Sequence, residues 1–199
     1  KTKIEKDTQP LADLDGVNIN RGVTTGFNPA FIIDNERKNQ LIHLDAKNKG
    51  IIKNLLQGRN IRKWFYDESD ENLLFIPWHF PLNEDNISGA SKMAEDIFKK
   101  EYPSLYVWMD SYKDALSDRN HDETGIRYEW YALQRCAASY YKEFEYREKI
   151  IWGLTADKWA FTIDTAQHYL PSNGYILTVT LVAFISRSEE RFSRNAETD

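Results

Sequence analysis

The sequence has little of what secreted, disulfide-bonded or membrane proteins need. A single cysteine, Cys136, excludes an internal disulfide and a cysteine-rich zinc site, and a lone thiol is typical of the reducing cytoplasm. The longest apolar run, from Val179 to Ile185, is far too short to span a bilayer. We therefore expect a cytoplasmic protein with no membrane partner, whose cysteine packs half-buried in the core.

The chain also lacks an initiator methionine and an apolar signal region, since it opens on Lys1-Thr2-Lys3-Ile4. Such an opening is typical of a segment taken from a longer polypeptide. We expect residues 1–15 to be a polar lead-in from an upstream domain and residues 16–185 to form the folded domain. Residues 186–199 are polar and are expected to be a disordered tail.

Motifs of common catalytic sites are missing as well. The four histidines show no paired metal-ligand spacing, there is no phosphate-loop lysine, and His79 and His168 adjoin aromatic residues, which favours packing roles. The tetrapeptide Asn28-Pro29-Ala30-Phe31 has the outline of the Asn-Pro-Pro-aromatic loop of amino-methyltransferases. Its third residue is alanine, and only 27 residues precede it, too few for the units that hold S-adenosylmethionine. We therefore exclude a methyl-transfer site in this chain.

A metal-dependent nuclease is a second catalytic alternative. Asp34 and Asp45 could hold Mg²⁺, and Lys47 could orient the attacking water. In that chemistry the second acid and the lysine usually share one strand, whereas the segment from Asp45 to Gly50 has the composition of a turn that begins a helix, with Asp45 as its N-cap. The turn is the favoured interpretation, and the nuclease stays open as the minor one.

What the chain does contain is enough apolar material for a folded domain. It has 199 residues, of which 41% are hydrophobic and 14% aromatic, so we expect one compact domain, with two small lobes as the alternative. Residue patterns predict strands over 17–20, 30–33, 61–66, 73–78, 149–152, 159–163 and 175–182, and helices over 48–57, 91–101, 103–116 and 130–141. This mixture predicts an α+β fold with a mixed twisted sheet and several peripheral helices.

A local excess of positive charge stands out in a chain whose net charge is −5. Residues 46–66 contain six basic residues and no acidic one: Lys47, Lys49, Lys53, Arg59, Arg62 and Lys63. Lys49 and Lys53 are four apart, which would place them on one face of the predicted helix, and Gly58 would cap its end. A basic face on an acidic protein favours contact with a polyanion, although Arg59 could instead pair with a carboxylate from residues 67–71.

A glycine-punctuated segment precedes this basic stretch. Gly22 and Gly26 bracket Thr24 and Thr25, and Asn28 follows. Such spacing predicts a tight loop that needs positive φ or a close backbone approach. The glycines could serve only to shape the turn.

Several blocks of sequence in a fixed order resemble one known family. They are Gly22-x-x-Thr25-Gly26-x-Asn28-x-Ala30-Phe31-Ile-Ile, Leu41-Ile42, Asp45, Ile51-Ile52-Lys53, Leu56-x-Gly58-Arg59-x-Ile61-x-Lys63-Trp64, Tyr102-Pro103, Trp130-Tyr131-x-Leu133, Tyr140-Tyr141, Lys149-Ile150-Ile151-Trp152 and Phe161. Together they resemble the TaqI-like C-terminal specificity domain, the target recognition module of type II restriction–modification enzymes that methylate adenine N6. The resemblance covers roughly residues 16–180.

The resemblance implies a DNA-reading module without chemistry of its own. In such enzymes an N-terminal methyltransferase domain of the same polypeptide binds S-adenosylmethionine, so no cofactor is expected in this chain, and its partners would be double-stranded DNA and that domain. The expected phosphate contacts are Lys53, Arg59, Arg62 and Lys63. Thr24, Thr25 and Asn28 would hydrogen-bond to DNA from the glycine loop, and Arg21 is the expected base-reading arginine.

Two functions of other classes remain alternatives. A protein-interaction module in a restriction or phage-defence assembly would use an exposed aromatic and acidic surface from Asp67 to Asp96. The Mg²⁺ nuclease is the second. Salt-sensitive DNA binding distinguishes the recognition module from the first alternative, and metal-dependent cleavage distinguishes it from the second.

Overall fold

Two antiparallel sheets hold the strands of the described residues, which in this computed structural model are 10–82, 86–135, 142–154 and 160–179. The larger sheet has the order β1-β7-β5-β6 and consists of β1 (Val17–Arg21), β7 (Gly174–Val179), β5 (Lys149–Gly153) and β6 (Phe161–Asp164). The smaller has the order β2-β4-β3 and consists of β2 (Ile32–Ile33), β4 (Asn72–Leu74) and β3 (Ile52–Asn54). The predicted α+β fold is confirmed, but the described strands form two antiparallel sheets and not the one mixed sheet that the sequence predicts.

The helices lie mainly in the first two thirds of the chain. They are α1 (Asn28–Phe31), α2 (Asn35–Leu44), α3 (Lys92–Glu101), α4 (Pro103–Asp110) and α5 (Lys113–Ser117), with short 3-10 turns η1 (Leu11–Asp13), η2 (Ala46–Gly50), η3 (Gly58–Asn60) and η4 (Lys142–Glu145). Two predicted helix starts are confirmed, because the Ser91 hydroxyl accepts from the Ala94 amide at the start of α3 and Pro103 begins α4. None of the described helices is long and apolar enough to cross a membrane.

The predicted helix over 48–57 is wrong. The helix lies earlier, in α2, where the Asp34 carboxylate accepts from the Arg37 amide as N-cap. Asp45 ends α2 and caps η2, and the buried Asn48 side chain donates to the Leu41 carbonyl, which fixes a tight turn. The apolar residues after it, including buried Ile52 and Leu55, belong to strand β3 and the segment that follows. Lys49 and Lys53 therefore do not share a helix face.

The predicted strand over 61–66 is a hairpin turn. Ile61 and Tyr66 form an isolated antiparallel bridge, and the Arg62 amide donates to the Phe65 carbonyl at 2.9 Å. Trp64 lies inside the turn at φ 77°. Residues 30–33 are likewise only half strand, because Asn28–Phe31 form α1 before β2 begins.

Other boundaries differ more locally. The predicted helix over 103–116 is broken between α4 and α5, where Tyr112 leaves helical geometry. Residues 130–135 are irregular, since the Leu133 amide donates to the Ile76 carbonyl and not along a helix. The rest of that predicted helix, Cys136, Trp159 and the chain before 10 and after 179 lie outside the described residues.

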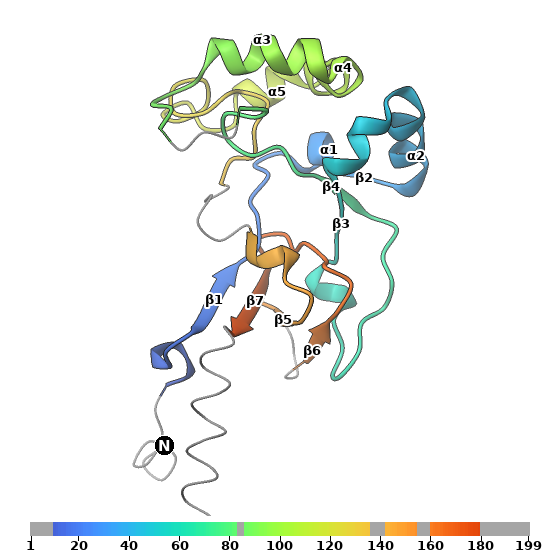
Figure 1. The fold of residues 1–199 in the computed structure, drawn as a ribbon, viewed down its shortest axis with the longest axis vertical. Coiled ribbons are helices and arrows are strands. Elements are labelled where there is room, and N and C mark those ends of the chain that lie inside the picture. The colour runs from blue at the N-terminus through green and yellow to red at the C-terminus, as the bar shows by residue number, and fades with distance from the viewer. Residues whose placement is uncertain (1–9, 83–85, 136–141, 155–159, 180–199) are drawn as a thin grey trace, which may run out of the picture.

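Figure 1 shows how these elements are arranged: the larger sheet occupies the lower part of the molecule, α3, α4 and α5 the top, and α1, α2 and the smaller sheet the right-hand side between them. One cluster of buried apolar side chains connects these parts. It includes Phe31, Leu73, Phe98, Ile151 and Ile176, which come from α1, β4, α3, β5 and β7. The two sheets and the helices therefore share one core.

Candidate nucleic-acid interface

The glycine-punctuated segment at residues 22–28 and the basic stretch at residues 46–66 both contact one segment of the chain, residues 169–174. The Val23 amide donates to the Leu170 carbonyl and the Leu56 amide to the Tyr169 carbonyl, both at 2.9 Å. On one side Gly22 lies against Pro171, and on the other Gly58 lies against Asn173. Segment 169–174 therefore positions the glycine loop and the basic segment relative to each other.

The close approach predicted for Gly22 is thus made to the protein's own backbone, and Gly58, which was predicted to cap a helix, also packs against backbone. A β-carbon on Gly22 would lie 2.1 Å from the Pro171 carbonyl oxygen, far inside contact distance. One on Gly58 would lie 3.2 Å from both the Asn173 carbonyl oxygen and the Gly153 α-carbon. At Gly22 any larger residue would push the packed backbone apart, whereas at Gly58 the fit is tight and a β-carbon would require the neighbouring backbone to move by a few tenths of an ångström.

Arg21 ends β1 on the edge of the larger sheet and is exposed. Its Nε donates to the Ser172 carbonyl. In the strand register Arg21 faces Tyr175, Tyr175 faces Trp152, and Trp152 faces Phe161. The Tyr175 and Trp152 rings stack with centroids 5.5 Å apart and planes 11° apart. An arginine and three half-buried aromatic rings thus form one row across the sheet.

The loop residues Thr24 and Thr25 connect β1 to α1, and Asn28 begins α1. Thr24 pairs with Arg135 through an isolated backbone bridge. Thr25 is buried, and its hydroxyl donates to the Asn28 side-chain oxygen at 2.6 Å. Thr25 therefore shapes the loop, while Asn28 is exposed at the start of α1.

Arg119 holds this loop, and sequence reasoning missed it. Its guanidinium, half-buried after α5, donates to four backbone carbonyls, those of Leu116, Thr25, Trp130 and Ala132. Burial lowers the pKa of Arg119 to about 10, which still leaves it charged at neutral pH. No sequence signal identifies a cation whose acceptors are carbonyls from three separate segments.

The predicted phosphate contacts are partly occupied by carboxylates. Lys53 Nζ lies 3.2 Å from Glu145 Oε1, Arg59 Nη2 lies 3.0 Å from Glu71 Oε1, and Arg62 Nη2 lies 2.7 Å from Asp67 Oδ2. The alternative predicted for Arg59, a partner among residues 67–71, is confirmed. All three pairs are at least partly exposed, and exposed pairs contribute only about 0–1 kcal/mol each, so a phosphate can replace the carboxylate at little cost.

Lys63 differs from its neighbours, since within the described residues no ion pair involves it. Its ammonium lies 5.7 Å from the centroid of the exposed Trp64 ring. The Trp64 amide donates to the Phe161 carbonyl at 3.0 Å, which joins the 61–66 hairpin to the edge of β6. The structure therefore places Arg62 and Lys63 at one edge of the larger sheet and Arg21 at the other.

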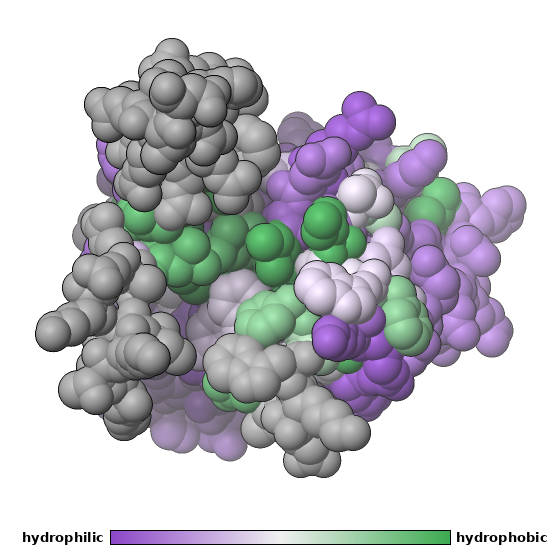
Figure 2. All heavy atoms as spheres, turned by 90° about the horizontal axis from the view of Figure 1, so that it is seen from below, coloured by the Kyte–Doolittle hydropathy of each residue, from purple (hydrophilic) through white to green (hydrophobic). Residues whose placement is uncertain are grey.

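The face of the sheet between these edges is apolar. Two residues further along each strand, and so on the same face as the row that begins with Arg21, a second row consists of Ile19, Leu177, Ile150 and Ile163. Ile163 is 63% exposed, and Ile19 and Ile150 are partly exposed. Figure 2 views the molecule from this end and shows apolar side chains in its middle, with hydrophilic ones mainly on the right-hand side. Arg21 on one side and Arg62 and Lys63 on the other therefore flank this apolar face at the edges of the sheet.

A buried ion pair between Lys149 and Asp164 lies next to His168, the residue that precedes segment 169–174. Lys149 Nζ lies 2.5 Å from Asp164 Oδ2, His168 Nδ1 lies 2.9 Å from Asp164 Oδ1, and both Lys149 and Asp164 side chains are fully buried. Burial raises the pKa of the Asp164 carboxyl, but hydrogen bonds and positive charge from His168 and Lys149 outweigh burial and lower it to about 2. The pair fixes His168, the residue that leads into the segment.

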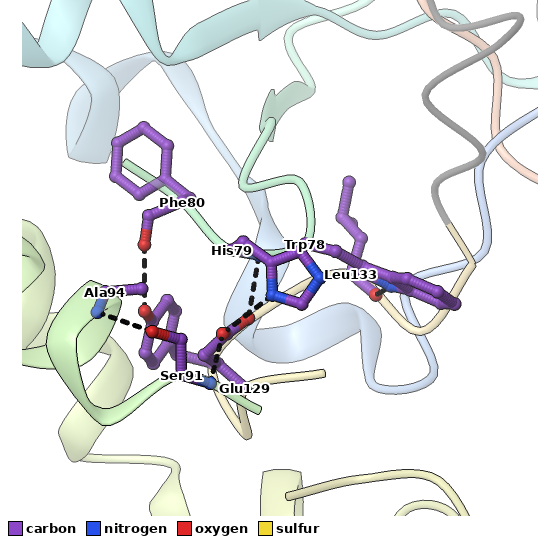
Figure 3. Close-up of polar contacts among 8 residues, drawn as sticks. Trp78, His79, Phe80, Ser91, Ala94, Glu129 and Leu133 are labelled. Atoms are coloured by element: carbon purple, nitrogen blue, oxygen red, sulfur yellow. Dashed lines mark hydrogen bonds and ion pairs between the residues drawn. The ribbon is translucent and has the colours of Figure 1, made fainter. Parts of the chain in front are cut away.

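A second buried carboxylate, Glu129, ties a loop to α3 (Figure 3). It accepts hydrogen bonds from the His79 amide at 2.7 Å, the Ser91 amide at 2.8 Å and His79 Nδ1 at 3.0 Å. Both carboxylate oxygens are used by the protein itself, and the imidazole is almost fully buried. His79 and His168 thus have the packing roles that the sequence predicts.

The carboxylates of the nuclease alternative act as helix caps. Asp34 accepts from the Arg37 amide and Asp45 from the Lys47 amide. In the described part of the chain, no group of three or more histidine, cysteine, aspartate or glutamate residues could hold a metal ion.

The surface expected for a protein-interaction module also differs from expectation. Of its aromatic residues, Phe75 and Phe80 are buried, and Trp78 stacks on Tyr128 at a centroid distance of 4.9 Å. Among the described residues the exposed aromatic side chains are Trp64, Phe65 and Tyr146, all of them outside the segment from Asp67 to Asp96.

Comparisons with known proteins point to restriction–modification enzymes. No family model matches the chain. It is 25% identical over 124 residues to the type II methyltransferase M.MjaIV of Methanocaldococcus jannaschii, a match that covers 62% of this chain and 36% of that protein. Its fold is similar to a chain of MmeI, a type IIL restriction–modification enzyme solved in complex with DNA, with a TM-score of 0.50, 12% identity, and coverage of 85% of this chain and 20% of that one. The chain thus spans well under half the length of either protein.

Proposed function

We propose that this chain is the DNA target recognition module of a restriction–modification methyltransferase that modifies adenine N6. The observation that carries the proposal is the similarity to M.MjaIV over 124 residues. The likeness of the fold to part of MmeI is consistent with it. S-adenosylmethionine and the methyl-transfer chemistry would belong to an N-terminal domain of the parent polypeptide.

The distribution of charge gives a plausible way to hold a duplex. Arg21 lies on one edge of the larger sheet, and the 61–66 hairpin with Arg62 and Lys63 lies beyond the opposite edge. Three gaps between strands separate β1 from β6, or about 14 Å, which is comparable with the roughly 12 Å width of the DNA major groove. Cations at the two edges could therefore contact phosphates or base edges on both sides of one groove.

The individual residues would have different roles. Arg59, Arg62 and Lys63 would bind phosphates. Arg59 and Arg62 would each give up a carboxylate for a phosphate oxygen. Lys53 would bind a phosphate by giving up its contact with Glu145. Arg21 would leave the Ser172 carbonyl to read a guanine edge. Asn28 and Thr24 would hydrogen-bond to DNA, and Thr25 would act by holding Asn28 in place.

A salt titration of duplex binding tests the proposal. The affinity of the full chain for a ~30-base-pair duplex should fall as salt rises, and Arg59→Ala should flatten the slope of log K against log salt by about 0.9. Lys100→Ala, which removes an exposed lysine from α3, is the matched control and should leave the slope unchanged. Equal slopes for wild type and Arg59→Ala would show that Arg59 does not bind a phosphate.

A further inference from the structure

Trp64 combines two features that are both unfavourable for a folded protein. Its side chain is 78% exposed, and its backbone lies at φ 77°, in the left-handed region that bulky residues rarely occupy. The next residue, Phe65, is 58% exposed. Glycine or asparagine would suit the backbone better, and a polar side chain would suit the solvent better. A strained and exposed tryptophan that folding does not explain indicates a function.

We infer that Trp64 and Phe65 form an apolar wedge that enters a groove of duplex DNA and unstacks a base step. The inference rests on the proposed DNA-binding function and extends it. Side chains that open DNA in this way are large and apolar and project from a backbone that binds the neighbouring phosphates. The 61–66 hairpin has both properties.

The base of the hairpin is firmly held, so its tip can act as a rigid wedge. Ile61 is buried and bridges to Tyr66, and the Asp67 amide donates to the Asn60 carbonyl at 2.9 Å. The Tyr66 ring packs edge-on against His168 at 5.0 Å, and His168 is fixed by Asp164. The exposed rings therefore project from a well-packed base.

The charges around the tip favour a polyanion as the occupant. Arg59, Arg62 and Lys63 lie within five residues of Trp64, and the Lys63 ammonium lies over its ring. Asp67 and Glu71 neutralise Arg62 and Arg59 while DNA is absent, in pairs that are exposed enough to exchange. An apolar protein surface would contact the rings but would leave the three cations without a partner. A DNA duplex offers phosphates to the cations and stacked bases to the rings.

Duplexes in which 2-aminopurine replaces some adenines test the wedge, because this base fluoresces more strongly when it is unstacked. Wild-type chain at saturation should raise the fluorescence. Trp64→Gly should abolish the rise and weaken binding about tenfold, and it should leave the salt slope unchanged because no phosphate contact is lost. Glycine accepts φ 77°, so thermal unfolding should show a folded variant.

Val107→Ala, which truncates an exposed apolar residue of α4, is the matched control and should behave as wild type. Arg62→Ala should flatten the salt slope and keep the fluorescence rise at saturation. If wild type binds without a rise, or if Trp64→Gly binds and unstacks as wild type does, the wedge is wrong and the proposed function stands. If neither the wild-type chain nor the parent polypeptide binds duplex at ~50 mM salt, the proposed function fails, and the wedge fails with it.

Discussion

Gly22 and Pro171 pack so closely that a β-carbon on residue 22 would lie 2.1 Å from the Pro171 carbonyl oxygen. The Gly22 amide also donates to the Gly174 carbonyl at 2.9 Å, so the two segments cannot separate without loss of a hydrogen bond. This contact joins the glycine loop to the turn that also supports Gly58. The geometry of the proposed DNA-binding surface therefore depends on it.

Gly22→Ala should destabilise the protein by about 2–4 kcal/mol, because the methyl group must push rigid backbone away. Urea unfolding measures the change. Gly50→Ala is the control, since a β-carbon there meets nothing within 4 Å, and its effect should stay within about 0.5 kcal/mol. Equal stability of the two variants would contradict the packing described for segment 169–174.

Arg119→Lys should cost about 2–4 kcal/mol, because an ammonium cannot reach the four carbonyls that the guanidinium binds and leaves several of them unpaired. Chemical unfolding measures the loss. Arg127→Lys is the matched control at an exposed arginine paired with Glu123, and should change stability by less than about 1 kcal/mol. A loss as small as that of the control would show that Arg119 does not hold the Thr25 loop.

Acid should remove stability through Asp164. Its pKa in the folded protein is about 2, below the ordinary value of 3.8, so its contribution is fully present above about pH 4 and is lost as pH falls through 2. The difference corresponds to about 2 kcal/mol. Urea unfolding between pH 2 and 7 measures it.

Asp164→Asn isolates this contribution from that of other acids. The stability difference between wild type and variant should shrink between pH 4 and 2. A difference that stays constant over that range would contradict the lowered pKa.

Glu129→Gln should destabilise the loop at 78–80 by about 1–3 kcal/mol, because an amide replaces one of the two oxygens that accept from His79 and Ser91. Hydrogen exchange of the His79 and Ser91 amides should accelerate in the variant. Glu101→Gln, at an exposed glutamate that ends α3, is the control. Unchanged exchange at both amides would mean that Glu129 does not hold them.

Local signals made parts of this fold predictable. Ser91 and Pro103 mark the starts of α3 and α4 by hydrogen bonding and a fixed φ that act within one turn. Strand β1 was predictable from the alternation of apolar and polar residues over 17–20, and β5 and β7 from short apolar runs. Helix α2 was missed because its residues are mostly polar and its burial is confined largely to Leu41.

The errors near the site arose where tertiary contacts decide the structure. The spacing of Ile51, Ile52, Leu55 and Leu56 fits a helix face, but the buried Asn48 turn and pairing with β4 make part of it a strand. Nothing in a Lys-Trp-Phe sequence signals positive φ at Trp64. The pairing of Lys53 with Glu145 joins residues 92 positions apart, which no local pattern reveals.

The salt dependence of duplex binding tests the central proposal most directly. If Lys53, Arg59, Arg62 and Lys63 each neutralise one phosphate, the slope of log K against log salt is about −3.6, and affinity falls about 150-fold between ~50 and ~200 mM salt. Fluorescence anisotropy of a labelled duplex measures it on the full chain and on the parent polypeptide. A fall of that order is the predicted result. No detectable duplex binding by the parent at ~50 mM salt, with this region intact, would contradict the account.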